Sequence, residues 1–249
     1  MVLAAALDVF TRSGGAFASR WLHVVVGITW IGLLYYFNFV QAPAFAALDA
    51  SSRNDATDKL ASRALWWFRW SALATFLMGI LILYFQEQLD DMDYFKTAPG
   101  ISILTGALLG TIMFLNVWGV IWPRQKVVIA NARNVLAGGE ADPNAAGAGR
   151  TALLASRQNT IFSLPMLMFM VGTSHFFGLG YDTTGGADRA IYWIVMLVVI
   201  AFFELNALGV FGKEPGGLRW MYDDHKNAIA TSVVLLVVMY GVWEIVFAT

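Results

Sequence analysis

The chain has 249 residues, of which 58% are hydrophobic and only 13% are charged, and its formal net charge is −1. A soluble domain of this size carries roughly a quarter charged residues, so this composition indicates a protein whose solvent is lipid. The near-neutral charge excludes the basic footprint of a nucleic-acid-binding protein. The absence of cysteine excludes disulfides, zinc thiolate sites and iron–sulfur clusters.

Apolar segments of about 20 residues, long enough to cross a bilayer, follow one another along the chain. They are expected at residues 17–41, 66–85, 101–122, 160–180, 190–211 and 228–247. Tryptophans near the segment ends fit the aromatic belts of a membrane protein, and they are Trp21, Trp66, Trp67, Trp122, Trp193 and Trp243. We therefore predict an all-α fold, a polytopic transmembrane helical bundle with about six spans that forms a single domain over residues 1–249.

The connecting segments differ in charge between the two sides of the predicted bundle. The segment after the second span is acidic, with Glu87, Asp90, Asp91 and Asp93. The opposite side carries the basic residues Arg53, Lys59, Arg63, Arg69, Arg124, Lys126, Arg133, Arg150, Arg157, Lys213, Arg219 and Lys226. The positive-inside rule then makes that side cytoplasmic, with both termini outside, in a bacterial inner membrane. Residues 123–159 are expected to form a cytoplasmic loop, with Gly138–Gly149 as its flexible part.

Two of the histidines lie at comparable positions in separate spans. His23 is about six residues inside the first span, and His175 is about five residues before the outer end of the fourth. Because these spans run in opposite directions, both imidazoles are expected within roughly 10 Å of the same membrane surface. Gly27 and Gly172 each lie one turn from a histidine and would clear the helix face for a flat macrocycle. Arg20, one turn outward of His23, could pair with a carboxylate.

This arrangement suits a haem iron with two axial imidazoles. We predict that His23 and His175 ligate the iron of one haem b between the first and fourth spans, with Gly27, Gly172 and Arg20 around the macrocycle. The other interpretation is structural, because glycines let membrane helices pack closely and a histidine can simply hydrogen-bond a neighbour. Ionisable residues inside membranes are usually functional, which supports the haem, but the spacing alone leaves both interpretations open.

Other polar residues in or near the spans admit two interpretations. His225 begins the sixth span, where a solvated helix start is favoured over a metal site, since neighbouring aspartates suit the helix dipole. Glu204 inside the fifth span either relays protons or bonds to Asn116 or a hydroxyl across the bundle. Asn38 and Gln41 are interpreted as polar groups that pack helices together.

Several segments are similar to the membrane domain of PuuD-type urate oxidases. Residues 21–32 (WLHVVVGITWIG) resemble the first span of that domain. Residues 110–117 (GTIMFLNV) and 121–128 (IWPRQKVV) resemble its central span and the basic segment that follows. Residues 159–175 resemble its next span, and residues 67–70 (WFRW) also have a counterpart. The resemblance extends over most of the chain in the order of the family.

The resemblance implies a helical membrane domain that passes electrons to a periplasmic cytochrome c, which is often fused at the C-terminus in the family. His23 and His175 are the histidines that match, and the spacing from His23 to Trp30 also looks like that of membrane proteins that bind haem b. This chain carries no fused cytochrome c domain and fewer spans. Residues 204–206 (Glu-Leu-Asn) stand where many relatives carry an Arg-His pair, and no obvious cluster of Arg, Gln and Asn offers a urate site.

We therefore expect a haem b-binding electron-transfer protein that passes electrons near the periplasmic face to a cytochrome c or a larger respiratory assembly. One alternative is a membrane-bound urate oxidase that acts on urate or a similar small reductant. The other is a cofactor-free accessory subunit of an electron-transfer complex. Membrane lipid surrounds the chain in each case, no nucleic acid partner is expected, and the sequence does not determine the oligomeric state.

Overall fold

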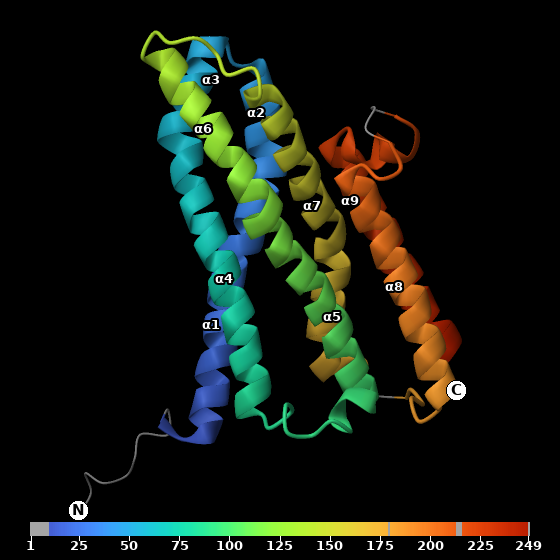
Figure 1. The fold of residues 1–249 in the computed structure, drawn as a ribbon. Helices are drawn as coiled ribbons and strands as arrows, with labels where there is room; N and C mark the ends of the chain where they lie inside the picture. Colours follow the sequence, from blue (N-terminus) through green and yellow to red (C-terminus); the bar gives the residue numbers. More distant parts are fainter. Residues whose placement is uncertain (1–9, 179, 213–215, 249) are drawn as a thin grey trace, which may run out of the picture.

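The computed structural model describes residues 10–178, 180–212 and 216–248, and within them the chain folds as a bundle of long helices (Figure 1). The prediction of an all-α fold is confirmed. An isolated bridge between Tyr181 and Ala248 is the only extended pairing in the described part of the chain. It ties the segment after α7 to the end of the last helix.

The first half of the chain forms three long helical rods, each made of two α-helices joined by a π-helical turn. The segments in order are α1 (Arg12–Tyr35), a π turn (Tyr36–Gln41) and α2 (Ala42–Ala47), then α3 (Ala50–Ala56), a π turn (Thr57–Ala61) and α4 (Ser62–Phe85), then α5 (Ala98–Leu115), a π turn (Asn116–Ile121) and α6 (Trp122–Leu136). A π turn contains one residue more than an α-helical turn and is frequent at functional sites.

The second half consists of α7 (Ala145–His175), α8 (Gly186–Leu208) and α9 (His225–Phe247), with a short 3-10 turn at Gly217–Tyr222 before α9. Another 3-10 turn, Tyr94–Lys96, lies in the connection between α4 and α5. α7 lies in the middle of the bundle, against α5, α6 and α9. α1 and α4 pack side by side on one flank, and α8 and α9 lie on the other (Figure 1). The central position of α7 makes it the helix on which the other elements converge.

Five helical stretches of the described chain are long and apolar enough to cross a membrane: Arg12–Ala47, Ala50–Phe85, Ala98–Leu136, Gly186–Leu208 and His225–Phe247. α7, which contains residues 160–175 of the predicted fourth span, falls outside this set. It carries many polar residues, but they are buried against neighbouring helices, and a membrane protein tolerates polar groups in its interior. A multi-pass protein is thus supported, while six spans and the orientation stay predictions.

The helices extend well beyond the apolar segments, so most of the expected cytoplasmic loop at 123–159 is helical, while its cytoplasmic location stays a prediction. α6 continues to Leu136 and α7 begins at Ala145, so only residues 137–144 connect them. Gly138–Gly149 is accordingly half loop and half helix. These extensions are amphipathic: Ile129 and Ala152 are buried, while Arg124, Lys126 and Arg133 of α6 are exposed. A search for apolar runs misses such helices because their mean hydropathy is low.

The bundle has two chemically distinct ends. The acidic end holds the connection from α4 to α5 and the start of α1, and the basic end holds the connection 137–144 and the turn between α2 and α3. α1 begins and α9 finishes at the acidic end (Figure 1). We call them the acidic end and the basic end. The location of the basic end in the cytoplasm is a prediction from the positive-inside rule.

Candidate functional site

His23 on α1 points toward α4, where its imidazole meets the backbone. Its Nδ1 lies 2.9 Å from the carbonyl oxygen of Thr75. Because a carbonyl oxygen only accepts hydrogen bonds, Nδ1 carries the proton, and Nε2 of the neutral ring keeps its lone pair. Metal-bound histidines commonly use this arrangement, in which the second ring nitrogen is held by a carbonyl or a carboxylate. His23 is therefore oriented as a metal ligand would be.

Glycines let α4 approach the His23 ring closely. A Cβ added at Gly79 would lie 3.4 Å from Cε1 and 3.5 Å from Nδ1 of His23. A Cβ added at Gly27 would lie 3.8 Å from Cγ2 of Thr75, which is an ordinary contact. Gly27 thus belongs to the contact between α1 and α4. Gly79 was not identified from the sequence, where an isolated glycine in a span carries little signal.

His175 is the last residue of α7 and is exposed. No hydrogen bond or ion pair of its imidazole is found within the described residues. The chain turns immediately after it, with the backbone N–H groups of Phe176 and Phe177 both 2.8 Å from the carbonyl oxygen of Gly172. A Cβ at Gly172 would lie only 2.6 Å from the Phe177 ring, which stacks on Phe169. The Phe177 ring therefore packs on Gly172. This face of α7 is occupied by Phe177 and is not open to a macrocycle.

The two histidines lie at similar depth in the bundle. The hydroxyl groups of Tyr35 on α1 and Ser163 on α7 are 2.8 Å apart, which fixes the two helices against each other. His23 lies twelve positions before Tyr35, and His175 lies twelve positions after Ser163. Since α1 and α7 run in opposite directions (Figure 1), each histidine lies about 18 Å from that contact toward the acidic end.

Between this contact and the acidic end, the facing sides of α1 and α7 are uncovered. Val24 and Ile28 on α1 are 53% and 68% exposed. Leu167 and Val171 on α7 follow Ser163 at helical spacing and are 37% and 60% exposed. The exposed faces are thus apolar, as a membrane-embedded cofactor site or a lipid contact requires.

Arg20 is exposed one turn from His23, toward the acidic end. It forms no ion pair with any residue that the structure describes. Its guanidinium is therefore available for an anionic group near the membrane surface.

A second constellation lies deeper, around a run of buried polar residues on α7 at 156–160 (SRQNT). Asn159 donates to the carbonyl oxygen of Met113 at 2.9 Å and accepts from Nδ2 of Asn116 at 3.0 Å. Asn116 Nδ2 also lies 3.2 Å from Oε2 of Glu204. The expected bond between Glu204 and Asn116 is thus present, and it links α8 to the third rod and α7.

Other elements converge on the same run. The Tyr222 hydroxyl lies 2.7 Å from Oε1 of Gln158 and 2.9 Å from the Phe203 carbonyl oxygen. Arg157 donates to the carbonyl oxygen of Tyr222. Asn38, in the first π turn, donates to Oγ of Ser156 at 2.8 Å, which agrees with its interpretation as a packing group. We call Asn38, Asn116, Ser156, Arg157, Gln158, Asn159, Glu204 and Tyr222 the polar network.

Several buried polar atoms of the polar network lack a partner within the described residues. They are Oδ1 of Asn38, Nε of Arg157 and Nε2 of Gln158, one acceptor and two donors. Buried polar atoms nearly always have a hydrogen-bond partner, so water or a small polar molecule would satisfy them. The sequence shows no obvious cluster of Arg, Gln and Asn. In the structure such residues do lie together, because three separate elements supply them.

His225 is the first residue of α9, beside the residue that caps this helix. Asp224 caps α9 by accepting from the Lys226 backbone N–H at 2.7 Å. Nδ1 of His225 lies 3.6 Å from Oδ2 of Asp224, beyond hydrogen-bond distance. No group of three or more potential metal ligands occurs among the described residues. These contacts favour the helix-start interpretation.

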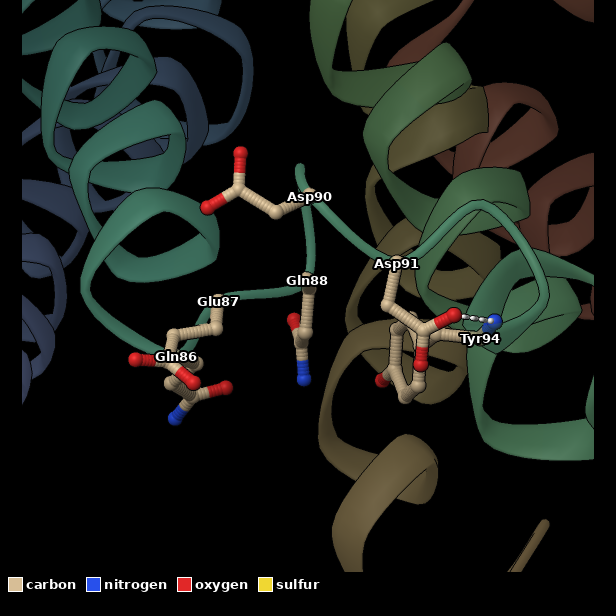
Figure 2. A pocket seen from close by; sticks show the side chains of 6 residues that line it. All are labelled: Gln86, Glu87, Gln88, Asp90, Asp91 and Tyr94. Atoms are coloured by element: carbon tan, nitrogen blue, oxygen red, sulfur yellow. Dashed lines mark hydrogen bonds between the residues drawn. The ribbon is translucent and has the colours of Figure 1, made fainter.

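The acidic end carries an open hollow lined by Gln86, Glu87, Gln88, Asp90, Asp91 and Tyr94 (Figure 2). Oδ1 of Asp91 accepts from the Tyr94 backbone N–H at 3.3 Å, whereas the Asp90 carboxylate points elsewhere (Figure 2). Glu87 forms an ion pair with Arg12 at 3.0 Å. Burial raises the pKa of the Tyr94 hydroxyl, so this side chain stays neutral at pH 7. The hollow presents net negative charge.

Comparison with known proteins finds one family similarity, over slightly less than half of the chain. A family model described as urate oxidase N-terminal matches residues 92–207. The match supports assignment to the urate oxidase N-terminal family. No curated protein and no solved structure matches the chain significantly.

The segment that matches the urate oxidase N-terminal family covers α5, α6 and α7 and most of α8. It contains Asn116, Asn159 and Glu204 of the polar network together with His175. His23 on α1 and Gly79 on α4 precede it. The family signal thus coincides with the polar network more closely than with the histidine pair.

Proposed function

We propose that this chain is a membrane redox domain of the urate oxidase type that holds one haem b between α1 and α7 and passes electrons at the acidic end. The orientation of His23 carries this proposal. Its Nδ1 is held by the Thr75 carbonyl, and its Nε2 is free to ligate iron. A histidine is rare in membrane helices unless it serves a function.

The surrounding residues fit such a group. His175 lies at the depth of His23 without a protein partner in the described structure, and apolar faces of α1 and α7 lie between them. Leu167 and Val171, rather than Gly172, provide the free face of α7. When bound, a haem supplies one-electron transfer at a potential that its axial ligands set. Thr75 would orient His23, and Arg20 would neutralise a propionate.

The acidic end supplies a surface for a redox partner. Glu87, Asp90, Asp91 and Asp93 lie in the connection beside α1. Carboxylates of this kind steer a positively charged partner and suppress wrong ones. A periplasmic cytochrome c with a basic face, or a subunit of a larger respiratory assembly, fits this surface if the acidic end faces the periplasm.

Absorption spectra of the purified protein, oxidised and reduced, test the haem. We expect a Soret band that His23→Ala and His175→Ala abolish or shift, while His225→Ala, a matched control, leaves it unchanged. A wild-type protein without a Soret band after expression with ample haem would favour the cofactor-free accessory subunit. Wild-type spectra in both His23→Ala and His175→Ala would refute the ligand assignment.

A topology reporter tests the periplasmic placement. An enzyme that is active only in the periplasm, fused after residue 249, should be active because α9 finishes at the acidic end. The same reporter in the connection 137–144 should be inactive. The reverse pattern would place the acidic end in the cytoplasm and exclude a periplasmic acceptor there.

Oxidation of urate is a second candidate function, and the polar network favours it. Urate is planar and polar, with N–H donors and carbonyl acceptors on its edges. The unpaired atoms of Asn38, Arg157 and Gln158 offer one acceptor and two donors inside the bundle. A buried site that hydrogen-bonds its substrate discriminates strongly against analogues that lack the matching groups.

An anaerobic assay separates the two functions. Urate is added to the oxidised protein, and reduction of the Soret band is followed with and without cytochrome c. Rapid, saturable reduction that Gln158→Leu abolishes without changing the resting spectrum would establish urate as substrate. Absence of reduction, in a protein that a chemical reductant still reduces, would leave electron transfer as the function.

A further inference from the structure

A pocket that neither proposed site uses lies between α4 and α6, toward the basic end. Its volume is about 460 Å³, and its walls include Arg63, Trp66, Arg69, Trp122, Lys126 and Arg133. α4 supplies the first three of these side chains and α6 the others. We call this the basic pocket.

Positive charge in the basic pocket is largely uncompensated. Arg133 forms an ion pair with Asp58. Arg63, Arg69 and Lys126 form none with any residue that the structure describes. Like charges that surround one cavity repel one another, so an anion in the cavity would relieve the repulsion. The electrostatics therefore point to a ligand with at least one negative charge.

Arg69 is positioned for an oxyanion. Its guanidinium carbon lies 3.7 Å from the centre of the Trp122 ring, a close cation–π contact. Its backbone carbonyl accepts from Nε1 of Trp118 at 3.1 Å, which fixes this part of α4 against the third rod. Stacking leaves the N–H edge of a guanidinium free, and that edge matches a phosphate with two parallel hydrogen bonds.

The position of the basic pocket indicates where the anion comes from. Trp66, in its wall, is 46% exposed, and Trp67 and Trp70 on the same helix are 60% and 43% exposed. Exposed tryptophans cluster at the level of the lipid headgroups. A soluble anion would not contact the exposed tryptophans beside the pocket. A phospholipid would place its phosphate on the cations and its acyl chains along the adjacent apolar surface.

We propose that the basic pocket binds the phosphate of an anionic phospholipid from the leaflet at the basic end. Basic pockets between transmembrane helices recognise lipid headgroups in this way. The proposal is independent of the haem and of urate, because the basic pocket shares no residue with the histidine pair or with the polar network.

Lipid binding to the purified protein in detergent tests this inference. Phosphatidylglycerol and phosphatidylcholine are titrated separately and counted by native mass spectrometry. We expect phosphatidylglycerol to bind more tightly, and Arg69→Gln and Lys126→Gln each to weaken it about fivefold. Arg124→Gln is the matched control, because Arg124 is an exposed cation on α6 outside the pocket wall. The Lys126 side chain is exposed, so its variant does not endanger folding.

Three outcomes would overturn the proposal. Equal affinity for the two lipids would show that charge is not recognised. An equal loss in Arg124→Gln and Lys126→Gln would show general surface attraction instead of a pocket. Competition by millimolar inorganic phosphate, with saturable phosphate binding of its own, would identify a soluble anion as the ligand.

Discussion

The two halves of the bundle are held together differently. Toward the acidic end, α1 rests on α4 through Gly27, Gly79 and His23, and its side facing α7 is uncovered. Toward the basic end, the first and third rods and the turn before α9 hydrogen-bond to α7 through the polar network, and α8 joins it through the bond from Asn116 to Glu204. The first rod thus bonds to α7 toward the basic end, whereas toward the acidic end its exposed side forms no such bond in the described chain. The interhelical bonds there join other helices, such as Ser102 to the Phe169 carbonyl and Thr105 to Tyr192.

This difference has a physical reason. Apolar helices gain little from meeting each other in lipid, so close association depends on small residues and interhelical hydrogen bonds. The polar network supplies such bonds at the basic end. At the acidic end, the Tyr35–Ser163 contact is the last bond between α1 and α7 that the described chain shows, and under the proposed function a bound haem would bridge the helices beyond it.

Asn159→Leu gives the largest expected effect on this comparison. It removes the bonds to the Met113 carbonyl and Asn116, so that the Asn116 amide keeps only its bond to Glu204 inside the bundle. We expect a loss of about 2–4 kcal/mol in the free energy of unfolding, measured by denaturant unfolding in detergent micelles. Thr111→Ala, which removes a hydroxyl bonded only within its own helix, should cost less than about 0.5 kcal/mol. Equal effects would mean that the polar network does not hold the basic end.

Gly79→Leu probes the acidic end. The added side chain begins 3.4 Å from the His23 ring, so it pushes α4 away and disturbs the bond to Thr75. Overpacking of this kind costs about 1–3 kcal/mol, and we expect lower haem occupancy by the ratio of Soret to protein absorbance. Gly32→Leu on α1 is the control, since no atom lies within 4 Å of its added Cβ. Full haem occupancy in both variants would show that haem binding does not depend on the contact between α1 and α4.

Tyr35→Phe tests the boundary between the two halves and has the smallest effect. It removes one hydrogen bond to Ser163, whose hydroxyl still donates to the Thr160 carbonyl. We expect a loss of about 1 kcal/mol in the free energy of unfolding and an unchanged Soret band. Tyr36→Phe, at the neighbouring position, is the control and should be near neutral. A Soret shift in Tyr35→Phe would show that this contact sets the spacing around the cofactor.

The sequence predicts the fold class well and the helix boundaries poorly. Apolar runs reveal where lipid surrounds the chain, but α6 and the first turns of α7 are amphipathic and escape such a search. The bond between Glu204 and Asn116 was among the alternatives that the sequence left open, because two polar groups in lipid need each other. The filling of Gly172 by Phe177 could not be anticipated, since it depends on how the chain turns after α7.

The polar network illustrates a different limit. Its residues come from the first π turn, α7, the third rod, α8 and the turn before α9, and no local spacing links them. Most of the run at 156–160 falls in the segment expected to be a loop, so its polar residues gave no signal of a buried network. The match to the urate oxidase N-terminal family includes that run, but partners such as Asn38 are recognised only once the helices are in place.

The π-helical turns make the three rods sensitive to length. Each residue in a helix advances the direction of its side chain by about 100°, so deletion of one residue from Asn116–Ile121 would rotate the whole of α6 relative to α5. Lys126 and Arg133 would then leave the basic pocket, and the ion pair to Asp58 would break, although no residue of α6 had changed. A substitution therefore changes the packing of only one of the two helices in a rod. A single-residue deletion in the π turn changes the direction of every side chain on the helix that follows.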